Sequence, residues 1–209
     1  MSLSSELRQA TSDLHQAVEQ HPLMQSLVNG ACHTARYGDY LQALHLTYRS
    51  LEAALSKAAA QGLAWATLSD PRWQRSLALQ QDLRHLGRDP DRGEPFLANY
   101  LSNGLGPTAS PAQAMPTAIA TAWARYLGDL AGGQILRQLF SRHHPQWPSA
   151  FYAFSPHDTN ALANELRPRI DALATDASER AATITAARAL FAAHIQLFDR
   201  LLAQEPAGT

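Results

Sequence analysis

The sequence predicts an all-α fold in which one irregular multi-helix domain spans residues 1–209. Alanine and leucine are the dominant residue types, β-branched residues are sparse, and apolar residues recur at the 3.6-residue period of a helix. A chain of 209 residues is long enough for one domain with a continuous hydrophobic core. The expected helices are too numerous and too unequal in length for a simple four-helix bundle.

The first part of the chain predicts three helices. Either Ser4 or Ser5 can cap the first helix, which ends in the region of Pro22. A second, long helix covers roughly residues 35–60. Pro71 suits the first turn of a third helix, because proline has no backbone N–H to leave unpaired and its φ is already helical.

The third helix is expected to stop near Gly87, where a segment rich in glycine and proline begins. Residues 87–116 predict a connector whose only helical pattern is a short one at 96–101. The helical pattern resumes around Thr117 and continues to His143, before a loop rich in aromatic residues and proline.

Two helices complete the expected fold. One runs from about 158 to 174, with a kink at Pro168. Asp176 and Glu179 have the spacing of a capping box and start the last helix. Its apolar face predicts burial of Ile184, Ala187, Phe191, Ile195, Phe198 and Leu202.

Charge and composition exclude several classes of protein. With 17 basic and 18 acidic residues the net charge is −1, whereas nucleic acid and anionic membrane surfaces require a basic excess in their partners. The longest charge-free stretch, residues 95–124, contains four prolines, so we expect no membrane-spanning helix. The single cysteine, Cys32, excludes an internal disulfide and thiolate metal cages. With no secretory signal visible, we expect a cytoplasmic protein, monomeric by default.

Three glycines interrupt the helix expected around residue 130. Each glycine in a helix interior costs about 1 kcal/mol relative to alanine, so Gly128, Gly132 and Gly133 need a compensating reason. Gly128 and Gly132 are four residues apart and clear one face of the helix over a full turn. Asp129 points from nearly the same side, and Arg125 lies one turn before it, at the spacing of an ion pair.

Two interpretations of this glycine cluster are open. The first is a close helix–helix contact, with Arg125 and Asp129 as an ordinary surface pair. The second is a flat ligand lying against bare backbone, with the Asp129 carboxylate beside it to hold water. The doublet Gly132–Gly133 exceeds what helix packing needs and favours the ligand.

Of the nine histidines, His15 is the candidate metal ligand. It joins the apolar stripe of the first helix, where the alternative is a partly buried histidine bonded to a backbone carbonyl. Arg8 lies two turns earlier on the same face, so an imidazole and a cation could hold the iron and an acidic edge of one macrocycle. His194 lies on the packed face of the last helix and is interpreted as a core histidine.

Three segments together resemble the haem oxygenase family. RYLGDLAGGQ at 125–134 resembles the distal-helix signature of these enzymes. LRQATSDLH at 7–15 resembles their proximal helix, with His15 in the place of the axial ligand, and ARALFAAHIQLF at 187–198 resembles their final helix. The resemblance spans residues 3–202 and is weakest at 86–117.

The resemblance implies a helical domain that clamps haem (iron protoporphyrin IX) between a proximal and a distal helix. The family cleaves haem with O2 and electrons from an external donor, and releases biliverdin, ferrous iron and carbon monoxide. The implied partners are therefore haem and an electron-donor protein, either a ferredoxin or a flavin reductase. The sequence names neither the donor nor the use of the product.

The resemblance also implies roles for the distal residues. Gly128, Gly132 and Gly133 bring the distal backbone into contact with haem. Asp129 orders a water that delivers protons, and Arg125 and Tyr48 orient Asp129 and its waters.

Other residues match positions around the haem edge. Phe191 is expected to pack against haem, and Arg8 and Arg167 are the candidate partners of the propionates. Trp123 replaces a smaller phenolic aromatic on the propionate side. Ser12 and Ala163 stand where some relatives carry lysines, which leaves the regiochemistry of ring opening undecided.

Three other interpretations of the sequence are open to comparison with the haem oxygenase resemblance. A non-catalytic haem carrier or sensor on the same fold would retain His15, but Asp129 favours an enzyme. The related helical fold of thiamin-degrading enzymes needs a nucleophilic cysteine, and Cys32 is interpreted as an unremarkable free thiol. A di-iron carboxylate bundle needs paired Glu-x-x-His motifs, which this sequence lacks.

Overall fold

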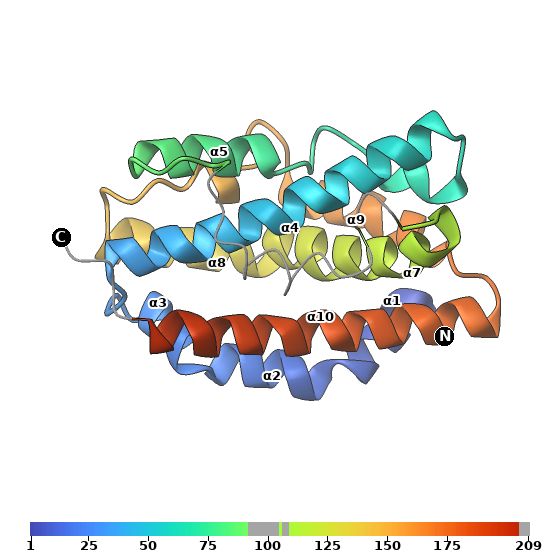
Figure 1. Cartoon of the computed structure of the whole chain (residues 1–209), viewed down its shortest axis with the longest axis horizontal. Helices are drawn as coiled ribbons and strands as arrows, with labels where there is room; N and C mark the ends of the chain where they lie inside the picture. The colour runs from blue at the N-terminus through green and yellow to red at the C-terminus, as the bar shows by residue number, and fades with distance from the viewer. Residues whose placement is uncertain (92–104, 106–108, 205–209) are drawn as a thin grey trace.

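Two layers of helices face each other across the molecule (Figure 1). The structure is a computed structural model and describes residues 1–91, 105 and 109–204, a part of the chain that contains no strand. The lower layer in Figure 1 consists of α1 (Leu3–Ala10), α2 (Ser12–Gln20), α3 (Pro22–Val28) and α10 (Ala177–Ala203). The upper layer holds α4 (Thr34–Ala60), α7 (Pro111–Ala122), α8 (Gly128–His143) and α9 (Thr159–Asp171), with α5 (Ser76–His85) outside it. The prediction of an all-α fold is confirmed.

The N-terminal segment forms two helices, so the prediction of one continuous helix is wrong. Ser2, not Ser4 or Ser5, caps α1 by accepting a hydrogen bond from the backbone N–H of Ser5. Thr11 separates α1 from α2 with a φ of −116°, and its hydroxyl donates to the Leu7 carbonyl at 2.8 Å. The backbone N–H of Thr11 donates to the same carbonyl, so Thr11 closes the last turn of α1.

The third predicted helix starts later than Pro71. In the structure α5 begins at Ser76, because the Glu52 carboxylate of α4 accepts hydrogen bonds from the backbone N–H groups of Arg75 and Ser76, at 2.6 and 3.1 Å. The preceding turn buries Trp73, whose indole N–H donates to the Leu68 carbonyl of η1 (Ala64–Leu68) at 2.8 Å. A carboxylate from another helix thus caps α5, and no local pattern predicts such a cap.

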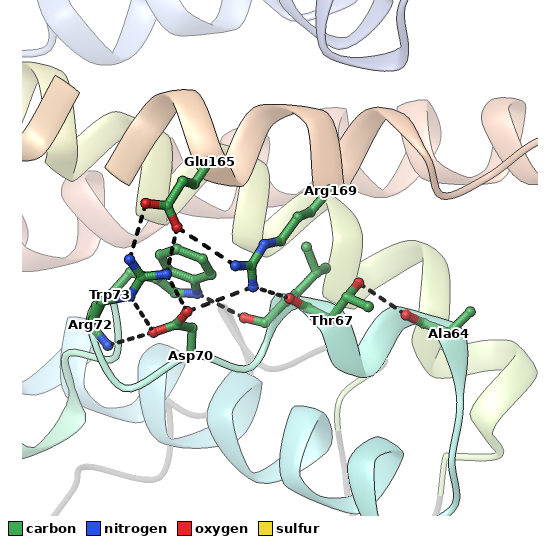
Figure 2. Close-up of polar contacts among 8 residues, drawn as sticks. Ala64, Thr67, Asp70, Arg72, Trp73, Glu165 and Arg169 are labelled. Atoms are coloured by element: carbon green, nitrogen blue, oxygen red, sulfur yellow. Dashed lines mark hydrogen bonds and ion pairs between the residues drawn. The ribbon is translucent and has the colours of Figure 1, made fainter. Parts of the chain in front are cut away.

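A network of ion pairs fixes the 70–73 turn to α9 (Figure 2). Arg72 bridges Asp70 and Glu165, with N···O distances of 2.7 and 2.6 Å. Arg169 approaches the same two carboxylates at 3.7 Å. Both guanidinium groups also lie over the Trp73 ring, at 5.4 and 4.9 Å from its centroid. Every charge drawn in this network has a partner, which is the arrangement expected of a structural clasp.

The helix predicted from Thr117 to His143 begins earlier and contains an irregular turn. Ser110 and Gln113 form a capping box that starts α7 at Pro111. Between α7 and α8 the backbone forms a π-helical turn, η2 (Trp123–Leu127), and α8 ends at His143 as predicted. A π turn holds more residues than an α turn, so it rotates the following side chains around the helix axis. The predicted pattern at 96–101 lies outside the described residues.

The C-terminal helices follow the predicted signals. Asp158 caps α9, which continues through Pro168 to Asp171. The backbone N–H of Glu179 donates to the Asp176 carboxylate at 2.8 Å, so the predicted start of α10 is confirmed. Among the described helices α10 alone is long and apolar enough to cross a membrane. This helix packs against α1, α2, α3 and α7, so other helices of the chain cover part of its surface.

Candidate active site

A cavity of about 360 Å³ opens between the two layers of helices. Its lower wall comes from α2, α3 and α10, and its upper wall comes from η2, α8 and one residue of α4. This volume lies in the range of small-molecule sites. The lining residues are mostly apolar, with polar groups contributed by His15, Glu19, Gln25, Tyr40, Arg125, Asp129 and His194.

His15 presents an exposed imidazole on the lower wall. Its side chain is 59% exposed, and its Nδ1 lies 3.6 Å from the Glu19 carboxylate one turn later. The ring tilts against Phe191 of α10, with centroids 5.9 Å apart. In the described part of the chain Nε2 makes no hydrogen bond, so it is free to act as a ligand. The alternative of a partly buried histidine bonded to a backbone carbonyl is not what the structure shows.

The three glycines of α8 serve two different purposes. A Cβ placed at Gly128 or Gly132 would meet no atom within 4 Å, so both residues present bare backbone to the cavity. A Cβ at Gly133 would lie only 3.0 Å from Cδ1 of Tyr152 in η3 (Ala150–Tyr152). Two of the glycines therefore leave one face of α8 open to the cavity, and the third permits a close contact between α8 and η3.

A residue of α4, Tyr48, contacts the Asp129 carboxyl. The Tyr48 hydroxyl, which is fully buried, donates a hydrogen bond to Asp129 Oδ2. Burial raises the pKa of the Asp129 carboxyl well above its usual range. The Gln134 amide donates to the backbone carbonyls of Asp129 and Tyr152, at 3.2 and 3.0 Å, and so ties η3 to this turn of α8.

Arg125 does not form the predicted ion pair with Asp129 in the described structure. The π turn that contains Arg125 breaks the four-residue register on which that prediction relied. Arg125 instead lines the cavity and interacts with Tyr40 and Tyr152, while its buried Nε has no hydrogen-bond partner. In place of the expected surface pair, Arg125 is a half-buried cation whose Nε is buried.

The candidate propionate partners do not line the cavity in the described structure. Arg8 on α1 and Arg167 on α9 are both exposed. Trp123 in η2 is half-buried and meets Phe191 edge to face, with centroids 6.4 Å apart. Because α9 contacts both α1 and η2, these three residues lie on neighbouring elements.

The structure adds two polar residues to the cavity, and the sequence analysis interpreted one of them, His194, as a core histidine. His194 lines the cavity although it is 2% exposed, and burial, followed by the nearby Arg125 and His21, lowers its pKa well below the usual value. Tyr40 also lines the cavity, and burial raises the pKa of its hydroxyl to about 12. One signal was available for His194, because it follows Phe191 by three residues on the same helix face.

Cys32 is buried and does not line the cavity. Burial raises the pKa of its thiol, which disfavours the thiolate that a nucleophile requires. The structure therefore places no cysteine nucleophile at this site.

Comparison with known proteins decides the family. The family model for heme oxygenase matches residues 1–200. The chain belongs to the haem oxygenase family. It is 25% identical to Heme oxygenase 1 of Gallus gallus, over 95% of this chain and 69% of that protein. It is 24% identical to Heme oxygenase 1 of Synechocystis sp., over 96% of this chain and 85% of that protein.

Solved haem oxygenases share the fold. Heme oxygenase-1 of Synechocystis sp. PCC6803, solved in complex with heme, superposes with a TM-score of 0.85 at 24% identity, covering 96% of this chain and 92% of that one. The haem oxygenase of Leptospira interrogans superposes with a TM-score of 0.82 at 25% identity, covering 96% and 100%. Membership of the family and the assignment as an enzyme are confirmed, and a non-catalytic carrier is not favoured. The roles of individual residues stay predictions.

Proposed function

We propose that this haem oxygenase binds haem in the cavity and cleaves it, with O2 and electrons from an external donor, to biliverdin, ferrous iron and carbon monoxide. One observation carries the proposal. The His15 imidazole of the lower wall and the bare backbone of Gly128 and Gly132 in the upper wall face the same cavity. A flat macrocycle with a central metal fits such a space, because it needs one ligand below and no side chains above.

His15 is the proposed iron ligand. A neutral imidazole is a common axial ligand of haem iron, and the exposed ring is accessible from the cavity. Glu19, next to Nδ1, would hold the ring in one orientation, as carboxylates do for metal-bound histidines. Haem, when bound, supplies the iron at which molecular oxygen is activated.

Asp129 is the proposed source of ordered water on the other side of the haem. The Tyr48 hydroxyl fixes one carboxyl oxygen, which leaves the other available to a water in the cavity. Because burial raises the pKa of Asp129, the carboxyl can hold and release a proton nearer to neutral pH than an exposed aspartate can. Gly128 and Gly132 leave this water space to approach the haem.

Arg8 and Arg167 stay the proposed partners of the propionates. Both are exposed cations on helices that adjoin the cavity walls, and their long side chains can reach a carboxylate at the cavity mouth. Trp123 and Phe191 would flank the haem edge between them. The electron donor is proposed to be a ferredoxin or a flavin reductase, and the chain is proposed to act in the cytoplasm.

An absorption time course tests this function. The purified chain is mixed with stoichiometric haemin, and spectra are followed in air with catalase before and after ascorbate is added. The proposal predicts a Soret band that decays into the broad red absorption of biliverdin. A Soret band that persists with ascorbate and with a competent reductase would indicate a carrier and contradict the proposal.

A further inference from the structure

Four polar residues lie together in or beside the cavity wall, and the proposed function leaves most of their polar groups unused. Tyr40 comes from α4, Arg125 from η2, Tyr152 from η3 and His194 from α10. Three of them line the cavity, and Tyr152 lies behind Gly133, close enough to interact with Tyr40 and Arg125. We call these four residues the inner cluster.

The inner cluster contains a cation without a counter-ion. Arg125 is the one lysine or arginine that lines the cavity in the described part of the chain, and it forms no ion pair there. Its Nε is buried with no hydrogen-bond partner, and the buried hydroxyl of Tyr152 also has none. An unpaired charge and unsatisfied donors in a buried wall are unfavourable unless a ligand or water satisfies them.

The neighbouring groups add hydrogen-bond donors and little negative charge. Burial raises the pKa of the Tyr40 and Tyr152 hydroxyls, so both stay protonated at neutral pH. His194 is neutral and carries one ring N–H. Asp129 and Glu19 are the two carboxyls that line the same cavity. Burial raises the pKa of Asp129, which reduces its negative charge, and Glu19 lies against His15.

We propose that the inner cluster is a binding subsite for a small monovalent anion of the size of azide or nitrite, held by the Arg125 guanidinium with the Tyr40 hydroxyl and the His194 ring N–H. The anion is bound by the protein and not by iron. Tyr152 lies behind the site and closes it off from η3. The subsite does not depend on the proposed haem chemistry, so it is tested on the haem-free full chain.

Azide is the probe, because its infrared stretching band differs between water and a protein site. Azide is titrated into the haem-free chain, and the bound band is followed to saturation. We expect Arg125→Met to weaken azide binding by about tenfold or more, since it removes a charge-assisted hydrogen bond. Tyr40→Phe removes only a hydroxyl from the same wall and is expected to weaken azide binding by about threefold. This second variant keeps the proposal testable if Arg125→Met does not fold.

Arg137→Met is the matched control, because Arg137 is an exposed cation on α8, the helix that follows η2. This variant is expected to bind azide as the wild-type chain does. The proposal is overturned if no bound band forms, or if azide binds equally well to the Arg125→Met and Tyr40→Phe variants. Equal loss in the Arg137→Met variant would identify an adventitious ion only, attracted by general surface charge, and would also overturn it. Failure of haem turnover leaves these outcomes unchanged.

Discussion

The two walls of the cavity differ in how they hold their functional groups. On the lower wall His15 projects from the regular helix α2, is 59% exposed and has one polar neighbour, Glu19. On the upper wall Asp129 follows a π turn and is bound by Tyr48 from another helix. Burial raises the pKa of Asp129, whereas the environment of His15 is open to solvent.

This difference indicates what each task requires. Holding a metal needs one accessible nitrogen, and an ordinary amphipathic helix can supply it. Handling protons needs a carboxyl with an altered pKa and ordered water, which only buried contacts between distant segments can provide. Changes to the Asp129 carboxyl should therefore alter chemistry, while changes to the His15 imidazole should alter binding.

The largest expected effect follows removal of the Asp129 carboxyl. Asp129→Asn should retain haem but lower the rate of biliverdin formation by between about 10² and 10⁴-fold, the range for loss of a general acid. Tyr48→Phe should lower the rate less, and Tyr37→Phe is its control, because that buried hydroxyl bonds the Pro148 carbonyl away from the cavity. Wild-type biliverdin yield in Asp129→Asn would contradict the assigned role.

The difference in stability between wild type and this variant should depend on pH. The folded-state pKa of Asp129 is raised, so the folded chain holds a proton that the unfolded chain releases, and stability falls as pH rises above the usual aspartate value of 3.8. Asp129→Asn removes this loss and should be more stable than wild type at neutral pH, with the difference vanishing toward pH 3.8. Urea unfolding at several pH values measures it. A difference that grows as pH falls would show that Asp129 is stabilised as the anion.

The adjacent glycines Gly132 and Gly133 face different surroundings, because Gly132 borders the open cavity and Gly133 contacts Tyr152. Gly132→Ala should stabilise the haem-free chain by about 1 kcal/mol, since its Cβ meets open space, and should weaken haem binding. Gly133→Ala should not stabilise the chain in this way, because the added Cβ would lie 3.0 Å from Tyr152 Cδ1. Thermal unfolding and haem titration of both variants give the comparison. Equal stability changes would contradict the division between the two glycines.

The smallest effect is expected at the ion-pair network of Figure 2. Glu165 is 44% exposed and its partners are shared, so Glu165→Gln should cost no more than about 1 kcal/mol of stability. Haem affinity and turnover should not change, because none of these residues lines the cavity. Circular dichroism melting and haem titration check both statements. A change in haem affinity would show that this clasp positions the site.

Local sequence signals predicted much of this architecture. The cap at Asp176, the long helix α4 and the open face of Gly128 and Gly132 all follow from residue type and spacing. Long-range interactions were not predictable in this way. Glu52 decides where α5 begins.

The candidate site shows the same difference between local sequence signals, which were predictable, and long-range contacts, which were not. His15 and Asp129 were found as candidates because histidine in an apolar stripe and aspartate among helix glycines are unusual. The rotation of Arg125 was missed, because an α-helical period carries no information about an inserted π turn. The pairing of Gly133 with Tyr152 depends on a loop that returns from another part of the chain.

The central claim is that His15 holds the iron while the upper wall does the proton chemistry. Resonance Raman spectroscopy of the reduced haem complex tests it most directly, by the stretching band between iron and a histidine nitrogen. The account predicts this band in wild type and in Asp129→Asn, its loss in His15→Ala, and its return when imidazole is added to His15→Ala. A band that persists in His15→Ala without imidazole would contradict the claim and assign the ligand to another histidine, with His194 the first to examine.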